Sequence, residues 1–166
     1  MNLLFRLIKV ILLSFFRPRF GTLEMGTLNF IVWPHDLDPL FHMNNGRYLT
    51  IMDLGRFDII LRTGIGRLSL KNKWMPLVGY VSIQYKKPLR FFQRYQLQTR
   101  LIAWDEKWFY LEQRFVRKGQ LFARGLVKGI FRSHQTTISP VTILSMLGHN
   151  HPSPRPPEEL APLAGS

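Results

Sequence analysis

A helix that is apolar on most of its surface, followed by four alternating strands, constrains this chain most strongly. Over residues 45–63, apolar residues such as Ile51, Met52 and Ile59 recur at helical spacing, and further apolar side chains widen that surface nearly all round. Asn44 or Asn45 is a plausible N-cap, and Gly64 a plausible stop. A helix of this kind must be buried on most sides, so the rest of the domain has to surround it.

Long strands are predicted after this helix, over residues 77–88, 93–104, 107–117 and 120–132. One face of the last strand carries Ala123, Gly125 and Gly129. Such small residues mark either a bulge or a face that another backbone approaches closely, and we favour the buried helix lying there. With a short strand over residues 27–33 and a short helix over residues 140–146, the order predicts an α+β fold. In it, an antiparallel sheet wraps around one long central helix.

Residues 1–22 form a separate basic and apolar segment. Eleven residues between Leu3 and Phe16 are apolar, which falls short of the ~20 residues that a membrane-spanning helix needs. Arg6 and Lys9 fall on a narrow polar stripe of the helix. Three alternatives are open: a helix in the membrane interface, a helix packed on a partner subunit, or a targeting segment.

The remaining chain divides into a domain over residues 23–148 and a tail over residues 149–166. The tail holds five prolines without apolar periodicity, so we expect it to be disordered. The whole chain of 166 residues carries a net charge of +13, which predicts an anionic partner. It has no cysteine, which excludes disulfides, thiolate nucleophiles and cysteine-ligated metal sites.

The densest polar run, residues 35–48, lies directly ahead of the predicted buried helix. It holds the carboxylates of Asp36 and Asp38, two histidines and two asparagines. A helix N-terminus presents free N–H groups to an oxygen that gains negative charge, and a nearby carboxylate can attack a carbonyl or activate water. Acyl transfer to water is the natural reaction class. The alternative is structural: the acids form turns and the asparagines are caps.

This run resembles the D-x-D-x-x-x-H-x-N-N-x-x-Y signature of the 4-hydroxybenzoyl-CoA thioesterase-like hotdog family, and the strand order over residues 27–148 agrees with it. The resemblance implies a hotdog fold and a homodimer or homotetramer whose sheets join edge to edge. It also implies hydrolysis of an acyl-CoA or acyl-carrier-protein thioester, without metal or cofactor.

The resemblance assigns roles to individual residues of the run. Asp38 matches the catalytic aspartate, which acts as nucleophile or general base. Asn45 falls where a backbone N–H at the helix start polarises the thioester carbonyl. His42 and Asn44 match positions that shape the substrate site. Tyr48, which we include with them among the substrate-binding residues, matches a helix position that is more often structural than chemical.

Four other positions depart from the family pattern or match it outside the catalytic run. Phe41, which we include among the substrate-binding residues, stands where many members have glycine, and so narrows the pocket or alters the loop. Asp36 is interpreted as a loop organiser. Asp53 and Arg56 match an acidic and a basic position in the helix, and form a candidate salt bridge there.

We therefore expect an acyl-CoA thioesterase, cytoplasmic, with peripheral membrane contact through residues 1–20. The alternative is a non-catalytic, membrane-associated acyl- or lipid-binding hotdog protein, motivated by Phe41 and the N-terminal segment. Nucleic-acid binding is a third and weaker alternative, because the charge favours it but no recognition motif supports it.

Overall fold

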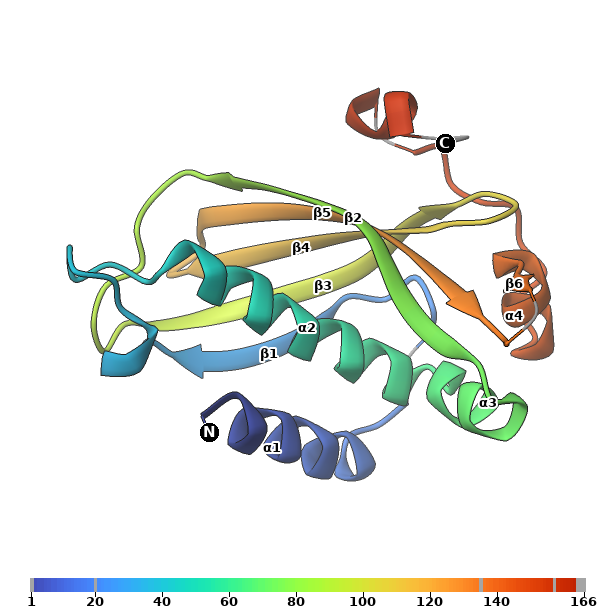
Figure 1. Cartoon of the computed structure of the whole chain (residues 1–166), viewed down its shortest axis with the longest axis horizontal. Coiled ribbons are helices and arrows are strands. Elements are labelled where there is room, and N and C mark those ends of the chain that lie inside the picture. Colours follow the sequence, from blue (N-terminus) through green and yellow to red (C-terminus); the bar gives the residue numbers. More distant parts are fainter. Residues whose placement is uncertain (1, 20, 135, 157, 164–166) are drawn as a thin grey trace.

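The computed structural model describes residues 2–19, 21–134, 136–156 and 158–163. Its elements follow a simple order along the chain (Figure 1). They are α1 (Asn2–Phe16), β1 (Gly26–Ile31), the 3-10 turn η1 (Pro34–Asp36), α2 (Asn45–Arg62), α3 (Ile65–Asn72), β2 (Met75–Tyr85), β3 (Arg94–Trp104), β4 (Phe109–Arg117), β5 (Gln120–Arg132), β6 (Thr137–Ile138), α4 (Pro140–Met146) and the 3-10 turn η2 (Glu158–Leu163).

The strands form one antiparallel sheet in the order β1-β3-β4-β5-β2, with β6 added beside β5. The helix α2 lies across one face of this curled sheet (Figure 1). At the turn between β4 and β5, Lys118 and Gly119 have φ values of 50° and 75°, which suit a two-residue hairpin turn. The predicted α+β hotdog architecture is confirmed.

Small residues allow α2 to lie close to the sheet. A Cβ atom on Gly125 of β5 would lie 2.4 Å from Cε of Met52, and one on Gly55 would lie 2.4 Å from Oγ1 of Thr99. The side-chain amide of Gln113 donates to the carbonyl of Met52 at 2.8 Å, which ties the helix to β4. The helix therefore packs on the Ala/Gly face, as the glycine pattern of the last strand predicts.

Both ends of α2 follow the predicted capping chemistry. The side chain of Asn44 accepts a hydrogen bond from the N–H of Gly46 at 2.8 Å. At the other end Gly64 follows the last turn with a φ of 88°, a left-handed conformation that glycine adopts without strain.

Besides the two 3-10 turns, two small elements, α3 and β6, were not expected from the sequence. α3 follows α2 at once, because Gly64 redirects the chain and Ile65 is buried in a second apolar cluster with Leu101 and Ile143. β6 is only two residues long and pairs with the end of β5. β2 is also shifted from its predicted range: it ends at Tyr85, and the next two amides instead donate to the carbonyl of Phe122.

The N-terminal segment forms the helix α1, which packs on the domain beside α2 (Figure 1). Its inner face is marked by Arg6, Val10, Leu13 and Arg17, spaced as one side of a helix, and Val10 is buried in the main core. Arg6 thus turns inward rather than joining an outward polar stripe. The outer face is apolar and exposed, with Leu4, Phe5, Ile8, Leu12, Phe15 and Phe16.

Among the described helices, none combines the length and the apolar character needed to cross a membrane. Residues 1 and 20 of the N-terminal segment lie outside the described residues.

Part of the tail over residues 149–166 lies against the sheet. Its 3-10 turn η2 places Leu160 against Ala103, Tyr110 and Leu126 on the outer face of the sheet. Arg124 also pairs with Glu159 at 2.6 Å. One apolar side chain and one ion pair therefore hold the described part of this turn; residues 157 and 164–166 lie outside the described part.

Candidate active site

The polar loop before α2 is a tight hairpin rather than an open coil. Leu37 and Met43 form a β-bridge between its two arms. Two backbone hydrogen bonds also join the arms: the N–H of Asp38 donates to the carbonyl of His42 at 2.8 Å, and the N–H of Asn44 donates to the carbonyl of Asp36 at 2.8 Å. Asp38 therefore lies at the tip of the hairpin, while the start of α2 lies at its base.

The backbone fixes the orientation of the Asp38 carboxylate. Oδ1 accepts hydrogen bonds from the amides of Leu40 at 2.9 Å and His42 at 3.1 Å. Oδ2 has no hydrogen bond within the part of the chain that the structure describes. Asp38 is half-buried, so one carboxylate oxygen is held in place and the other is available to a substrate or a water molecule.

The first turn of α2 retains donor capacity next to this loop. The amide of Gly46 donates a hydrogen bond to the Asn44 side chain, and the amide of Arg47 donates to the Asn44 carbonyl at 2.9 Å. The amide of Asn45 has no acceptor among the described residues, and the Tyr85 hydroxyl donates to the Asn45 carbonyl at 3.2 Å. This N–H, at the positive end of the helix dipole, suits an oxygen that gains negative charge.

The remaining predicted residues separate into buried and exposed positions. Tyr48 is buried, and its hydroxyl accepts from the amide of Leu89 at 3.3 Å; its burial raises its pKa. It thus anchors the helix in the core. Phe41 is 74% exposed with a φ of 59°, and His42 pairs through its backbone with Arg90 of the neighbouring loop.

Asp36 is fully buried and organises the base of the loop. Its carboxylate pairs with Arg6 of α1 at 2.5 Å and accepts from the amide of Trp33 at 2.9 Å. Arg47 lies 3.7 Å from the same carboxylate. Sequence reasoning missed Arg6, Arg47 and Tyr85 as parts of this site; a cation that interrupts an apolar segment was the available signal for Arg6, and Lys9 gives the same signal without lying at the site.

This charge cluster also affects His35. Burial is the largest influence and lowers the pKa of His35, Asp36 opposes that shift, and the positive charges of Arg6 and Arg47 reinforce it.

A second, apolar region lies between the C-terminal half of α2 and β2. It is a small cavity of ≈150 Å³ with walls that include Phe57, Leu77 and Leu111. The predicted pair of Asp53 with Arg56 forms at its edge, and Arg56 also donates to Oε1 of Gln113 at 2.8 Å. Burial lowers the pKa of Arg56, and Asp53 opposes that shift.

A hotdog sheet around α2, with an acidic hairpin at the helix N-terminus, defines the class of this domain. Residues 32–163 match the family model of the thioesterase-like superfamily, and the chain belongs to that superfamily.

Curated relatives include proteins named as thioesterases. The chain is 38% identical over 131 residues to Protein THEM6 of Xenopus laevis, covering 78% of this chain and 62% of that protein. It is 29% identical over 136 residues to the probable thioesterase YBR096W of Saccharomyces cerevisiae, covering 80% of this chain and 59% of the yeast protein. The chain thus spans about three fifths of the length of these relatives.

Solved structures share the fold. The probable thioesterase YbaW from Escherichia coli superposes with a TM-score of 0.69 at 19% identity, covering 75% of this chain and 96% of that chain. A thioesterase complexed with coenzyme A and Zn from Thermus thermophilus superposes with a TM-score of 0.64 at 21% identity, covering 75% and 98% of the two chains.

Proposed function

We propose that this protein hydrolyses the thioester of an acyl-CoA or an acyl carrier protein. The observation that carries the proposal is the Asp38 carboxylate, oriented by two backbone amides, beside a helix whose first N–H, that of Asn45, has no acceptor among the described residues. Membership of the thioesterase-like superfamily supports it, as do relatives named as thioesterases and a structural neighbour solved with coenzyme A.

In this proposal Asp38 acts on the thioester carbonyl, either directly or through water. As general base, the carboxylate takes a proton from water while the water oxygen bonds to the carbonyl carbon. The Asn45 amide stabilises the resulting oxyanion. The carbon–sulfur bond then breaks, and the proton on Asp38 passes to the departing thiolate. As nucleophile, Asp38 instead bonds to the carbonyl carbon and displaces the thiolate, which leaves as the thiol; water then hydrolyses the resulting acyl anhydride to the acid and restores the Asp38 carboxylate.

The substitution Asp38→Asn tests this assignment. Asparagine keeps an oxygen for the amides of Leu40 and His42 but cannot act as a base, so kcat/KM should fall by about 10²–10⁴ while the unfolding temperature stays near that of the wild type. The assay measures thiol release across acyl-CoA chain lengths and from aromatic acyl-CoAs. Glu106→Gln, at an exposed turn, is the matched control. Unchanged turnover in Asp38→Asn would overturn the assignment.

We also propose that α1 contacts a membrane surface through its outer face. The large side chains of Leu12, Phe15 and Phe16 are 55%, 75% and 87% exposed, and cationic residues accompany them on the same segment. This favours the alternative function, an acyl- or lipid-binding protein held at a membrane. The two functions are separated by the assay above: acyl binding without hydrolysis over the whole panel supports the alternative.

The membrane contact is testable without removing α1, whose inner face is part of the domain. Leu12→Gln with Phe16→Gln should lower binding to anionic liposomes at least tenfold in a sedimentation assay. Leu70→Gln, at an 82% exposed position on α3, controls for loss of an exposed apolar side chain. Equal liposome binding by the α1 variant and the control would contradict the proposal.

A further inference from the structure

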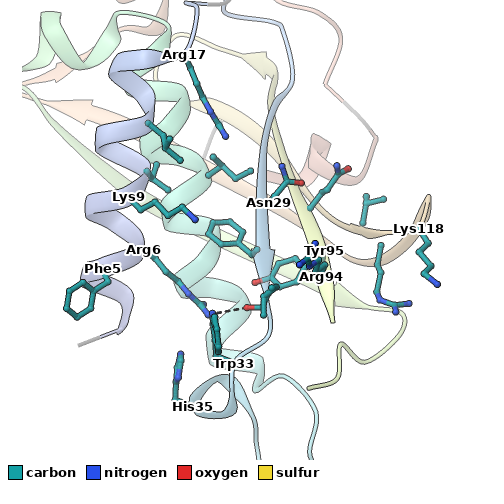
Figure 2. A pocket seen from close by; sticks show the side chains of 18 of the residues that line it. Phe5, Arg6, Lys9, Arg17, Asn29, Trp33, His35, Arg94, Tyr95 and Lys118 are labelled. Carbon is teal, nitrogen blue, oxygen red and sulfur yellow. Dashed lines mark hydrogen bonds between the residues drawn. The ribbon is translucent and has the colours of Figure 1, made fainter. Parts of the chain in front are cut away.

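A large groove runs between α1 and the edge strand β1, apart from the tip of the candidate catalytic loop. Its volume is ≈1230 Å³, and neither Asp38 nor Asn45 lines it. Figure 2 shows α1 along one side of the groove, with Asn29 of β1 and Tyr95 of β3 across from it. Ligand pockets for drug-sized molecules typically span about 300–1,000 Å³, so this groove has room for a larger, elongated molecule.

The groove is rich in positive charge, and none of the described residues that line it is acidic. Lys9 extends from α1, and Arg94 and Lys118 lie across the groove from it (Figure 2). Arg94 begins β3, while Arg117 ends β4 and Lys118 lies in the β4–β5 turn; all of them line the groove. Within the described residues, none of these four cations forms a salt bridge. They are therefore a positive field that the protein itself leaves uncompensated, and an anionic ligand would balance it.

The walls between these cations are mainly apolar, with Arg6, Arg17, Asn29 and Gln96 among the apolar side chains. Val10 and Leu13 line the groove from α1, and Leu28 and Phe30 from β1. The hydroxyl of Tyr95 is buried on this wall and has no hydrogen-bond partner among the described residues. An apolar channel that ends in a cationic cluster fits a molecule with one alkyl chain and one anionic head.

We propose that this groove binds a single-chain lipid phosphate monoester, with the alkyl chain between α1 and β1 and the phosphate against Arg94, Arg117 and Lys118. A phosphate monoester carries a charge of about −1.5 to −2 at neutral pH, which matches a cluster of several cations better than a carboxylate does. The guanidinium groups of Arg94 and Arg117 can each bind two phosphate oxygens. This site is separate from the thioester chemistry and does not depend on it.

The test uses decyl phosphate as the probe, titrated as monomers into the full chain by isothermal calorimetry. We expect one molecule to bind per chain. Inorganic phosphate, 1-decanol and coenzyme A should each bind at least tenfold more weakly, because each lacks either the chain or the phosphate monoester on it. Coenzyme A binding as tightly as decyl phosphate in the groove would make it a coenzyme subsite and overturn the proposal. Binding only to vesicles containing phosphatidate, and not to the monomer, would also overturn it.

Charge variants locate the site. Arg94→Gln with Arg117→Gln should weaken decyl phosphate binding at least tenfold. Arg67→Gln with Arg132→Gln removes the same charge from α3 and the end of β5, and should change the affinity less than twofold. Lys118→Gln changes an exposed turn residue and should weaken decyl phosphate binding by a smaller, several-fold factor. This single variant tests the same site if the double variant does not fold. Equal affinities in the groove and control variants would overturn the proposal.

Asp38→Asn should bind decyl phosphate as the wild type does. Loss of binding in Asp38→Asn, with retention in the groove variants, would place the molecule at the catalytic loop instead and likewise overturn the proposal.

Discussion

At the scale of single residues, the hairpin before α2 holds a bulky side chain in an unfavourable backbone conformation. Phe41 has a φ of 59° and hydrogen-bonds through its amide to the Asp38 carbonyl at 3.0 Å. Its ring is 74% exposed, so little burial offsets the left-handed backbone. The tight turn that orients the Asp38 carboxylate imposes this conformation, which glycine would adopt without strain.

The substitution Phe41→Gly should therefore stabilise the protein. An L-residue in the left-handed region costs roughly 1–2 kcal/mol, and glycine loses about 0.5–1 kcal/mol of chain entropy on folding, so we expect a net gain of about 0.5–1 kcal/mol. Urea denaturation measures it. Phe41→Ala removes the ring but keeps the strain, so it should show no gain. A loss of stability in Phe41→Gly would show that the ring makes contacts that matter.

The sequence predicted local chemistry at this scale well but missed long-range pairs. The cap by Asn44 and the Asp53–Arg56 pair both form, because residues three or fewer positions apart are brought together by the helix itself. The pair of Arg6 with Asp36 joins residues 30 positions apart. Nothing in a single sequence sets that distance, which depends on how α1 docks.

At the scale of elements, α1 belongs to the domain rather than standing apart from it. Arg6 donates to the carbonyl of Ile31 at 3.3 Å and pairs with the buried Asp36. Arg17 donates to the carbonyl of Thr27 at 3.3 Å. The helix thus reaches both the edge of β1 and the base of the candidate catalytic loop.

Removing the Arg6 charge should remove its hydrogen bond to the Ile31 carbonyl and its ion pair with Asp36. Arg6→Met leaves a buried carboxylate with fewer partners, and we expect a loss of about 3 kcal/mol in the free energy of unfolding. Lys9→Met on the same helix is the control, because Lys9 forms no salt bridge within the described chain. The double variant Arg6→Met with Asp36→Asn no longer buries an unpaired carboxylate, so it should regain part of the lost stability. Thermal melts measure the difference. No difference between the Arg6 and Lys9 variants would contradict this role.

An ion-pair network joins three strands on the outer face of the sheet. Glu112 of β4 pairs with Arg100 of β3 at 2.7 Å and with Arg124 of β5 at 2.6 Å. Burial by itself raises the pKa of Glu112, but the hydrogen bonds from Arg124 and Arg100 outweigh burial and hold that pKa below its usual value.

This shift gives a pH-dependent contribution to stability. Because the pKa of Glu112 is lower in the folded state, its stabilisation is complete above the unfolded value of about 4.3 and is lost as the pH falls through the folded value. Glu112→Gln should cost about 2 kcal/mol at pH 7 and progressively less below pH ~4. Urea denaturation across pH, with Glu106→Gln as the control, measures this. A constant difference at all pH values would rule out the charged pairing.

The sequence predicted most elements because their signals are local. The bounds of β5 and α4 agree with the prediction, since a two-residue turn and a Ser-Pro start define them. α3 escaped prediction because eight residues carry too little periodicity to distinguish a helix from a loop. The docking of α1 depends on tertiary contacts alone.

At the scale of the whole molecule, the two edges of the sheet differ. Arg6 and Arg17 cover carbonyls of β1, whereas β2 has no strand beside its outer edge among the described residues. On β2, Leu77, Val78 and Tyr80 are 41%, 48% and 39% exposed. We propose that two copies join along β2 into a homodimer, which can pair further into a tetramer.

A charge on this edge should separate the copies. Val78→Lys places a cation at the contact between copies, and the position is exposed in the single chain, so the fold should tolerate it. Light scattering after size exclusion should show a shift from dimer to monomer. Leu70→Lys adds the same charge at an 82% exposed position on α3 and should leave the dimer intact. A dimer that persists in Val78→Lys would place the contact elsewhere.

The arginines on the β1 edge also limit how far such a sheet can grow. Once two copies share their β2 strands, each outer end of the joined sheet is a β1 strand in which two carbonyls, those of Ile31 and Thr27, are already bonded to Arg6 of α1 and to Arg17 just after it. Growth by strand addition therefore terminates at two chains instead of continuing into a fibre. In the proposed dimer, displacement of α1 from the domain would therefore expose the β1 edge to addition of a further strand.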